Sequence, residues 1–276
     1  MKELNLNEIR KLQLEALEYL KNICDKNNVD YFITSGTLLG AVKYKGYIPW
    51  DDDVDVGLKR EDYKKLINLL ENDSNKDYKI LSIYNTKDYY YCFAKLVCTK
   101  TKLYENCKEI KDMGVYIDIF PFDYYDDDYE KFIKKIKIIK NLSIRRYGIK
   151  NNLEKSNNLE VTLPKVDRFR KIKNIIYSCA DFLSLPLGYK FWVIKFDKLI
   201  SKNKSGKYIT RGYRYKVKFD SEMFNDFTEY SFEGIKLKGI KDADTFLKAI
   251  YGDYMKDLPK EKQRTHHQMK AYWKDE

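Results

Sequence analysis

The alternation of apolar and polar residues divides the first part of the chain into short helices and strands. Apolar residues recur at helical spacing over 9–23 and again over 60–70, which predicts two amphipathic helices. Between them we expect a short strand over 29–34, a turn at Ser35-Gly36-Thr37 and a second short helix over 38–42. After a loop over 43–50, further strands, expected to share one sheet, are predicted over 51–58, 78–84, 90–97 and 115–120.

The second half of the chain is predicted to be mostly helical. The pattern predicts a basic helix over 129–146, a polar loop over 150–165, helix over 166–200 broken near Pro186, short strands around 208–219 and 229–237, and a helix over 242–251. No internal repeat is visible, so we expect one domain over 1–276. In it, residues 1–125 form an α/β core and residues 126–276 elaborate it and complete the site.

Composition narrows the class of partner and the compartment. The chain has 276 residues and a formal net charge of +11, which favours polyanions such as nucleotides, phosphorylated glycans or an anionic membrane face. The 5 cysteines show no metal-ligand spacing, which indicates a reducing, cytoplasmic compartment. No signal segment or membrane-spanning run is apparent. We therefore expect a protein that is soluble or lies on a membrane surface.

The segment IPWDDDVDVGL, residues 48–58, combines strand-like alternation with four carboxylates. In a strand, Asp51, Asp53 and Asp55 face the same way, about 6.6 Å apart in steps of two residues. Carboxylates at that spacing can share a hard divalent cation, which would relieve their mutual repulsion. One alternative is a solvated acidic cluster. Another is a calcium loop with Asp62 in the twelfth place, although Val56 stands where that loop needs glycine.

Two neighbouring segments extend this hypothesis. Ser35-Gly36-Thr37 lies between a strand and a helix, where backbone N–H groups and a hydroxyl can bind phosphate; a plain helix cap is the alternative. Asp118 is a single charge in the apolar run GVYIDIFP, so we expect it to meet a metal or a basic side chain. Together the segments have the layout of a nucleotidyltransferase-type site, in which Asp51 is better placed to orient ligands than to bind the metal.

These residues resemble a known family. The run TSGTLLGAVKYKGYIPWDDDVDVGL, residues 34–58, is similar to the hallmark of LicD-type phosphotransferases, which include the fukutin-related proteins. YIDIFPFD, residues 116–123, resembles the second motif of that family. Phe232-Glu233-Gly234 and YGDYMKDLPKEKQRTHH, residues 251–267, resemble its C-terminal motifs. The resemblance extends from about residue 30 to residue 267, and the middle, about 125–215, is matched only by pattern.

The resemblance implies a nucleotidyltransferase-like fold and a transferase activity. The expected reaction moves a substituted phosphoryl group, phosphocholine in the usual bacterial case, from a CDP-activated donor to a hydroxyl of a cell-surface glycan or its lipid-linked precursor, and releases CMP. Such glycans include lipopolysaccharide, teichoic acid and capsule. By motif position, Asp53, Asp55 and Asp118 would be catalytic and hold Mg²⁺, with Mn²⁺ as the alternative. Substrate-binding residues are expected to be Gly36, Thr37, Lys43, Trp50, Asp51, Lys95, Tyr251, Arg264, His266 and His267.

The resemblance is not complete, and other readings remain. Lys43 and Tyr44 stand where relatives often carry Arg and His, which affects donor or acceptor contacts rather than the metal site. Aromatic candidates for a choline head group are Trp50, Tyr251, Tyr254 and Trp273. The basic stretch 131–146 could contact the inner face of an anionic membrane. The main alternative is a nucleotidyltransferase that releases pyrophosphate; nucleic acid is not an expected partner, because no binding motif is present.

Overall fold

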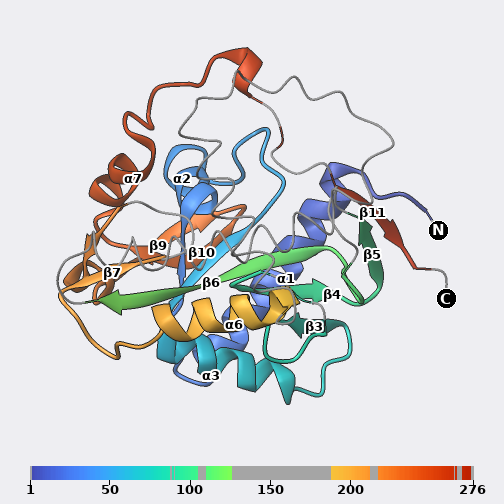
Figure 1. The fold of residues 1–276 in the computed structure, drawn as a ribbon. Coiled ribbons are helices and arrows are strands. Elements are labelled where there is room, and N and C mark those ends of the chain that lie inside the picture. Colours follow the sequence, from blue (N-terminus) through green and yellow to red (C-terminus); the bar gives the residue numbers. More distant parts are fainter. Residues whose placement is uncertain are drawn as a thin grey trace, which may run out of the picture.

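A mixed β-sheet runs across the computed structural model, with helices packed around it (Figure 1). The structure describes residues 2–87, 89, 91–104, 110–125, 188–211, 217–263, 265 and 269–274. The predicted helix over 129–146, the predicted loop over 150–165 and most of the predicted helix over 166–200 lie outside the described residues. The α/β fold class, with a mixed sheet as expected of a nucleotidyltransferase-like core, is confirmed.

The described elements follow in chain order. The helices are α1 Leu6–Lys26, α2 Ser35–Lys43, α3 Arg60–Glu71, α6 Gly188–Ile200 and α7 Ala243–Tyr251, with short 3-10 turns at Ser221–Phe224 and Lys260–Lys262. The strands are β1 Phe32–Ile33, β2 Asp55–Lys59, β3 Tyr78–Leu81, β4 Ala94–Cys98, β5 Thr101–Tyr104, β6 Tyr116–Tyr125, β7 Tyr208–Thr210, β8 Phe219–Asp220, β9 Phe227–Phe232, β10 Ile235–Ile240 and β11 Lys270–Trp273.

The strand order of the main sheet is β3-β4-β6-β2-β1-β10-β9, and β7 and β8 extend the far end of β6. Strands β2 and β6 at its centre run parallel, and in their register Asp55 lies opposite Asp118. Strand β10 from the second half pairs with β1, so the sheet is not confined to the first 125 residues. The described second half therefore contains strands as well as helices.

Several element boundaries follow from local chemistry. Asn5 and Glu8 form a capping box that starts α1, and the side chain of Asp242 caps α7, so both helices agree with the predicted ones. The predicted strand over 29–34 is reduced to two residues. The predicted turn at Ser35 is instead the first turn of α2. Strands β5 and β11, which pair with each other beside the N-terminus, were not predicted.

The predicted acidic strand over 51–58 is too long, because β2 begins only at Asp55. Pro49 has no N–H to donate to a ladder. Arg10 of α1 donates to the carbonyl oxygens of Ile48 at 3.2 Å, Pro49 at 3.0 Å and Asp51 at 2.7 Å. Gln13 donates to the Asp52 carbonyl oxygen at 2.9 Å. Side chains of α1 thus satisfy the carbonyl groups that a neighbouring strand would otherwise bind.

The main core lies between the sheet and its helices and is rich in aromatic rings. Helices α1 and α3 contact each other and the central strands. The ring of Phe32 meets Phe122 and Phe224 edge to face, with centroids 5.0 and 5.4 Å apart. Gly57 lies beside these rings: a Cβ there would be 2.4 Å from the Phe32 ring. This glycine lets aromatic side chains pack directly against β2.

A buried charge cluster fixes α3 and α6 to the central strand β6. The guanidinium of Arg60, at the start of α3, donates to Asp123 of β6 at 2.7 Å and to Asp197 of α6 at 2.8 Å. Tyr84 also donates its hydroxyl to Asp197. Burial raises the pKa of Asp123 although Arg60 opposes the shift, so this carboxylate depends on Arg60 for its charge.

We expect Arg60→Met to lower the free energy of unfolding by about 3–5 kcal/mol, because two buried carboxylates lose their cation. The measurement is urea denaturation. The matched control is Lys79→Met, which removes an exposed pair with Asp112 and should cost less than about 1 kcal/mol. Equal losses in the two variants would show that the cluster does not hold these helices.

Candidate active site

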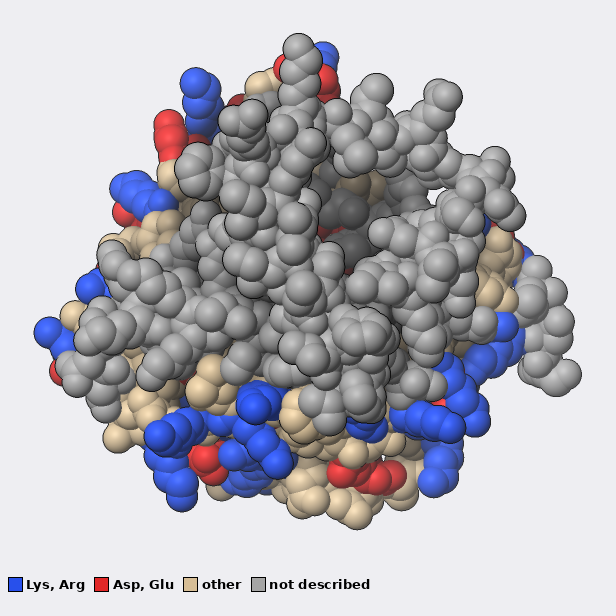
Figure 2. All heavy atoms as spheres, viewed as in Figure 1, with Lys and Arg blue, Asp and Glu red and all other residues tan. Residues whose placement is uncertain are grey.

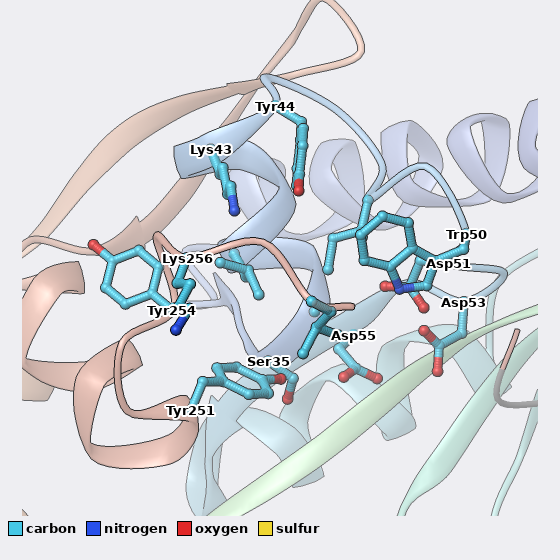
Figure 3. Close-up of a pocket in the computed structure, with 14 residues that line it drawn as sticks. Ser35, Lys43, Tyr44, Trp50, Asp51, Asp53, Asp55, Tyr251, Tyr254 and Lys256 are labelled. Atoms are coloured by element: carbon cyan, nitrogen blue, oxygen red, sulfur yellow. The ribbon is translucent and has the colours of Figure 1, made fainter. Parts of the chain in front are cut away.

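A pocket of about 310 Å³ opens where α2, the acidic segment and the residues after α7 meet (Figure 3). Its lining combines carboxylates, lysines and aromatic rings: Ser35, Gly36, Leu39, Lys43, Tyr44, Ile48, Trp50, Asp51, Asp53, Asp55, Tyr251, Tyr254, Lys256 and Leu258. In the view of Figure 3 the carboxylates of Asp51, Asp53 and Asp55 lie to one side, and Tyr251 and Tyr254 lie to the other. The pocket therefore has an acidic end and an aromatic end.

Three carboxylates converge at the acidic end. Asp53, Asp55 and Asp118 each offer an oxygen, and these oxygens lie within 4.8 Å of one another. The parallel register of β2 and β6 brings Asp55 beside Asp118, and Asp53 approaches from the segment just before β2. The sequence predicts the same three carboxylates as metal ligands. It places Asp53 and Asp55 together on one face of a strand, whereas in the structure Asp53 precedes the strand.

The electrostatics of this cluster fit a divalent cation. Burial and the charges of Asp55, Asp51 and Asp118 raise the pKa of Asp53 well above its usual range. Burial also raises the pKa of Asp51. The Oδ1 atom of Asp55 is buried and has no hydrogen-bond partner among the described residues. An acceptor that is buried without a donor, beside like charges, suits an oxygen ligand of a hard cation.

Two basic side chains flank the cluster. Lys95 of β4 lies 2.6 Å from Asp118 Oδ1, and the rings of Tyr91 and Tyr116 surround its ammonium group. Lys95 was predicted to bind substrate, but it does not line the pocket and its contact here is with a metal-ligand candidate. The expectation that Asp118 meets a basic side chain is confirmed, and its role as a metal ligand stays a prediction.

On the other side, Arg211 Nη1 lies 3.9 Å from Asp55 Oδ2 and donates to Ser35 Oγ at 3.0 Å. Its side chain is buried, and the guanidinium carbon lies 3.4 Å from the Phe120 ring centroid. Arg211 is not predicted from the sequence, because it belongs to no recognised motif. Only the pairing of β7 with β6 brings it to the site.

The start of α2 contacts the acidic segment directly. A Cβ on Gly36 would lie 2.6 Å from Asp51 Oδ2, so only glycine permits this approach. Thr37 accepts a hydrogen bond from the backbone N–H of Asp55 at 2.8 Å. Gly36 and Ser35 line the pocket, whereas Thr37, predicted to bind phosphate, instead fixes the backbone of a carboxylate ligand.

The remaining predicted residues are divided between the pocket and other places. Lys43, Trp50, Asp51 and Tyr251 line the pocket, as does Tyr254. Arg264, His266 and His267 lie outside the described residues, so their expected contacts stay predictions. Trp273 lies on β11, paired with Thr101 of β5, and is not part of the pocket.

Lys43 is held at the mouth of the pocket. Its ammonium group lies 2.7 Å from Asp257 Oδ1 and donates to the Met255 carbonyl oxygen at 2.9 Å. These contacts join the end of α2 to the segment that follows α7.

The Phe232-Glu233-Gly234 segment forms the tip of the β9–β10 hairpin and supports the loop before the acidic segment. The Glu233 carboxylate accepts from the Tyr47 N–H at 3.0 Å, and the Glu233 N–H donates to the Lys45 carbonyl oxygen at 2.9 Å. Glu233 has a positive φ of 49°, a left-handed conformation that is uncommon outside glycine. This motif therefore acts on the site through the loop that leads to Trp50.

The alternative interpretations of the acidic segment are wrong. Asp51, Asp52, Asp55 and Asp118 are buried, which excludes a solvated cluster. Asp62 lies on α3 and is not among the grouped carboxylates of the described chain, which excludes the calcium loop.

Lys and Arg side chains also lie outside the pocket. Figure 2 shows blue Lys and Arg side chains along the lower edge of the molecule, where Figure 1 places α3 and α6. Lys64, Lys65, Lys195 and Lys198 are exposed on these two helices. None of the helices in the described part of the chain is long and apolar enough to span a membrane.

Comparison with known proteins agrees with this geometry. Residues 28–147 match the family model of the LicD/FKTN/FKRP nucleotidyltransferase domain, which includes the acidic segment and Asp118. The chain is 25% identical to the lipopolysaccharide cholinephosphotransferase LicD of Haemophilus influenzae over 280 residues, which cover 99% of both chains.

Two shorter matches are to other proteins. An uncharacterised protein of Rickettsia typhi is 30% identical over 189 residues, and the match spans 56% of its length. The human ribitol 5-phosphate transferase FKRP is 40% identical over 48 residues, 17% of this chain and 10% of that protein. Fold, acidic site and family match together define a protein with a nucleotidyltransferase-type domain. Residues 28–147 thus match the LicD family model, and the whole chain is similar to LicD.

We expect Asp53→Asn to raise the free energy of unfolding of the metal-free protein at about pH 7.5, because it removes a disfavoured charge. Since the pKa of Asp53 is raised in the folded state, its carboxyl stabilises the fold at low pH. This stabilisation is lost as the pH rises through the raised pKa of Asp53. The advantage of the variant should therefore shrink at about pH 4.5. Urea denaturation in EDTA at both pH values measures it.

Adding Mg²⁺ should reverse this order. At about one hundred times its dissociation constant, Mg²⁺ should stabilise the wild type by about 2.7 kcal/mol and Asp53→Asn far less. The control is Asp77→Asn, the same change at an exposed aspartate paired with Lys100, which should respond as the wild type does. Equal stabilisation of Asp53→Asn by Mg²⁺ would contradict the metal site.

Proposed function

We propose that this protein transfers a substituted phosphoryl group, phosphocholine first among the candidates, from a CDP-activated donor to a hydroxyl of a glycan. The acceptor is a cell-surface glycan or its lipid-linked precursor, and CMP is released. The observation that carries the proposal is the group Asp53, Asp55 and Asp118 at the acidic end of a pocket whose other end is aromatic. Similarity over nearly the whole chain to a cholinephosphotransferase supports the transferred group.

Asp53, Asp55 and Asp118 would hold a magnesium ion, for which Mn²⁺ is the closest substitute. When bound, the ion supplies positive charge that neutralises the pyrophosphate of the donor. The orphaned Oδ1 of Asp55 supports this assignment, because it is already desolvated in a position to act as a ligand.

The chain's own side chains would position the two substrates. The N-terminal turn of α2, with Ser35 and Gly36, presents backbone N–H groups to donor phosphate. At the aromatic end, Tyr251 and Tyr254 offer ring faces that attract a quaternary ammonium group. A pocket with carboxylates for a metal ion and tyrosine rings suits a donor that is anionic at the pyrophosphate and cationic at the head group.

In the transfer, the acceptor oxygen forms a bond to the phosphorus that carries the alcohol substituent, and the bond from that phosphorus to CMP breaks. CMP leaves with the electron pair, and the hydroxyl proton passes to a carboxylate of the acidic end. Asp51 lines the pocket, and burial raises its pKa, which makes it a stronger base than an exposed aspartate.

The location of the acceptor completes the proposal. A CDP donor places the reaction in the cytoplasm, and a lipid-linked acceptor would bring the protein to the inner face of the plasma membrane. Exposed lysines on α3 and α6 support contact with an anionic surface.

The test is release of CMP from CDP-choline, CDP-ethanolamine and CDP-ribitol with Mg²⁺ and a bacterial glycan extract. We expect acceptor-stimulated CMP release, fastest with CDP-choline. Asp53→Ala should reduce it at least about a hundredfold, because the transition-state charge loses its compensation.

Asp77→Ala is the control, since Asp77 is exposed, and it should keep wild-type activity. Fastest release from CDP-ribitol would change the transferred group but keep the reaction. Release of pyrophosphate from a nucleoside triphosphate, with no CMP from any of the three donors, would overturn the proposal in favour of a nucleotidyltransferase.

A further inference from the structure

Ser35 has an unusual conformation for the first residue of a helix. Its φ is +51°, in the left-handed region that residues other than glycine rarely adopt. The residues before it are fixed: the Thr34 N–H donates to the Asp55 carbonyl oxygen at 3.1 Å. Such a conformation persists only where surrounding contacts determine it, and it places Ser35 in the lining of the pocket.

Arg211 supplies a contact that holds the Ser35 side chain in this place. Its Nη1 donates to Ser35 Oγ at 3.0 Å and lies 3.9 Å from Asp55 Oδ2, so one nitrogen faces both the α2 turn and a metal-ligand candidate. The guanidinium stacks on Phe120, and the side chain is 1% exposed. Arg211 does not itself line the pocket, so it acts on a ligand through Ser35 and through its charge rather than by direct contact.

The geometry assigns Arg211 as the positioning residue of the anion-binding turn. By donating to Ser35 Oγ it fixes the hydroxyl at the pocket wall, and its charge lies directly behind that wall. The ligand class is a pyrophosphate group, which the charge of Arg211 and the N–H groups of α2 both favour. This inference rests on the proposed function for the donor, but the anion site itself would serve any diphosphate.

If Arg211 had only a structural role, its loss would affect Mg²⁺ and pyrophosphate binding differently. Lys95 already compensates Asp118, and Arg211 compensates Asp55 from the opposite side. If Arg211 served only to hold Asp55 for the metal, its loss would weaken Mg²⁺ binding first. If it positions Ser35 for an anion, Mg²⁺ binding should persist, because removing a nearby cation does not repel the metal, whereas pyrophosphate binding should fall.

The experiment is titration calorimetry of the full chain with inorganic pyrophosphate and, separately, with CDP, both in Mg²⁺. The variants are Arg211→Met, Arg211→Lys, Ser35→Ala and the double variant Ser35→Ala/Arg211→Met. We expect Arg211→Met to weaken pyrophosphate binding about tenfold or more, the usual effect of losing a charge-assisted contact. The double variant should be no more than about threefold weaker than Arg211→Met, because both act on one contact.

Arg211→Lys keeps the charge and should recover part of the pyrophosphate affinity. If Arg211→Met does not fold, Arg211→Lys and Ser35→Ala still test the inference. Binding of Mg²⁺ alone should stay within about threefold of wild type in each folded variant. Unchanged pyrophosphate affinity, independent losses that multiply in the double variant, or a wild type that binds no pyrophosphate would overturn the inference. A wild type that binds pyrophosphate but not CDP would contradict the proposed donor. The role of Arg211 in positioning the anion-binding turn would then still stand.

Discussion

Repulsion between carboxylates on two adjacent parallel strands is the constraint on which the site depends. The register of β2 and β6 places Asp55 beside Asp118, and Asp53 joins them from the preceding segment. Unpaired charges this close and this buried would be costly without compensation. Lys95 and Arg211 compensate one carboxylate each, and the charge that remains is what a divalent cation would neutralise.

Elements far apart in sequence hold this cluster in shape. Arg10 and Gln13 of α1 take the carbonyl groups of the acidic segment, and Glu233 of the β9–β10 hairpin fixes the loop before it. Arg60 joins α3, β6 and α6 below the site. The site therefore depends on both halves of the chain, since β7 brings Arg211 and α7 leads into Tyr251 and Tyr254.

Local pattern predicted what depends on local chemistry. The helices α1, α3 and α7 and the central strands follow from apolar periodicity and caps, and the acidic residues Asp53, Asp55 and Asp118 from charges in apolar runs. The sequence could not predict that β2 begins at Asp55, because Arg10 replaces a strand partner. The sequence also could not predict the contact of Lys95 with Asp118 or the position of Arg211. Both depend on how strands far apart in the sequence pair with β6.

The most direct test of the account is the position of a bound metal. Crystals grown with Mn²⁺ and CDP, measured at the manganese absorption edge, locate the ion by its anomalous signal. The account predicts a peak bounded by the carboxylates of Asp53, Asp55 and Asp118, with Arg211 still on Ser35. Peaks only at exposed acidic residues, with these three carboxylates free of metal, would contradict it.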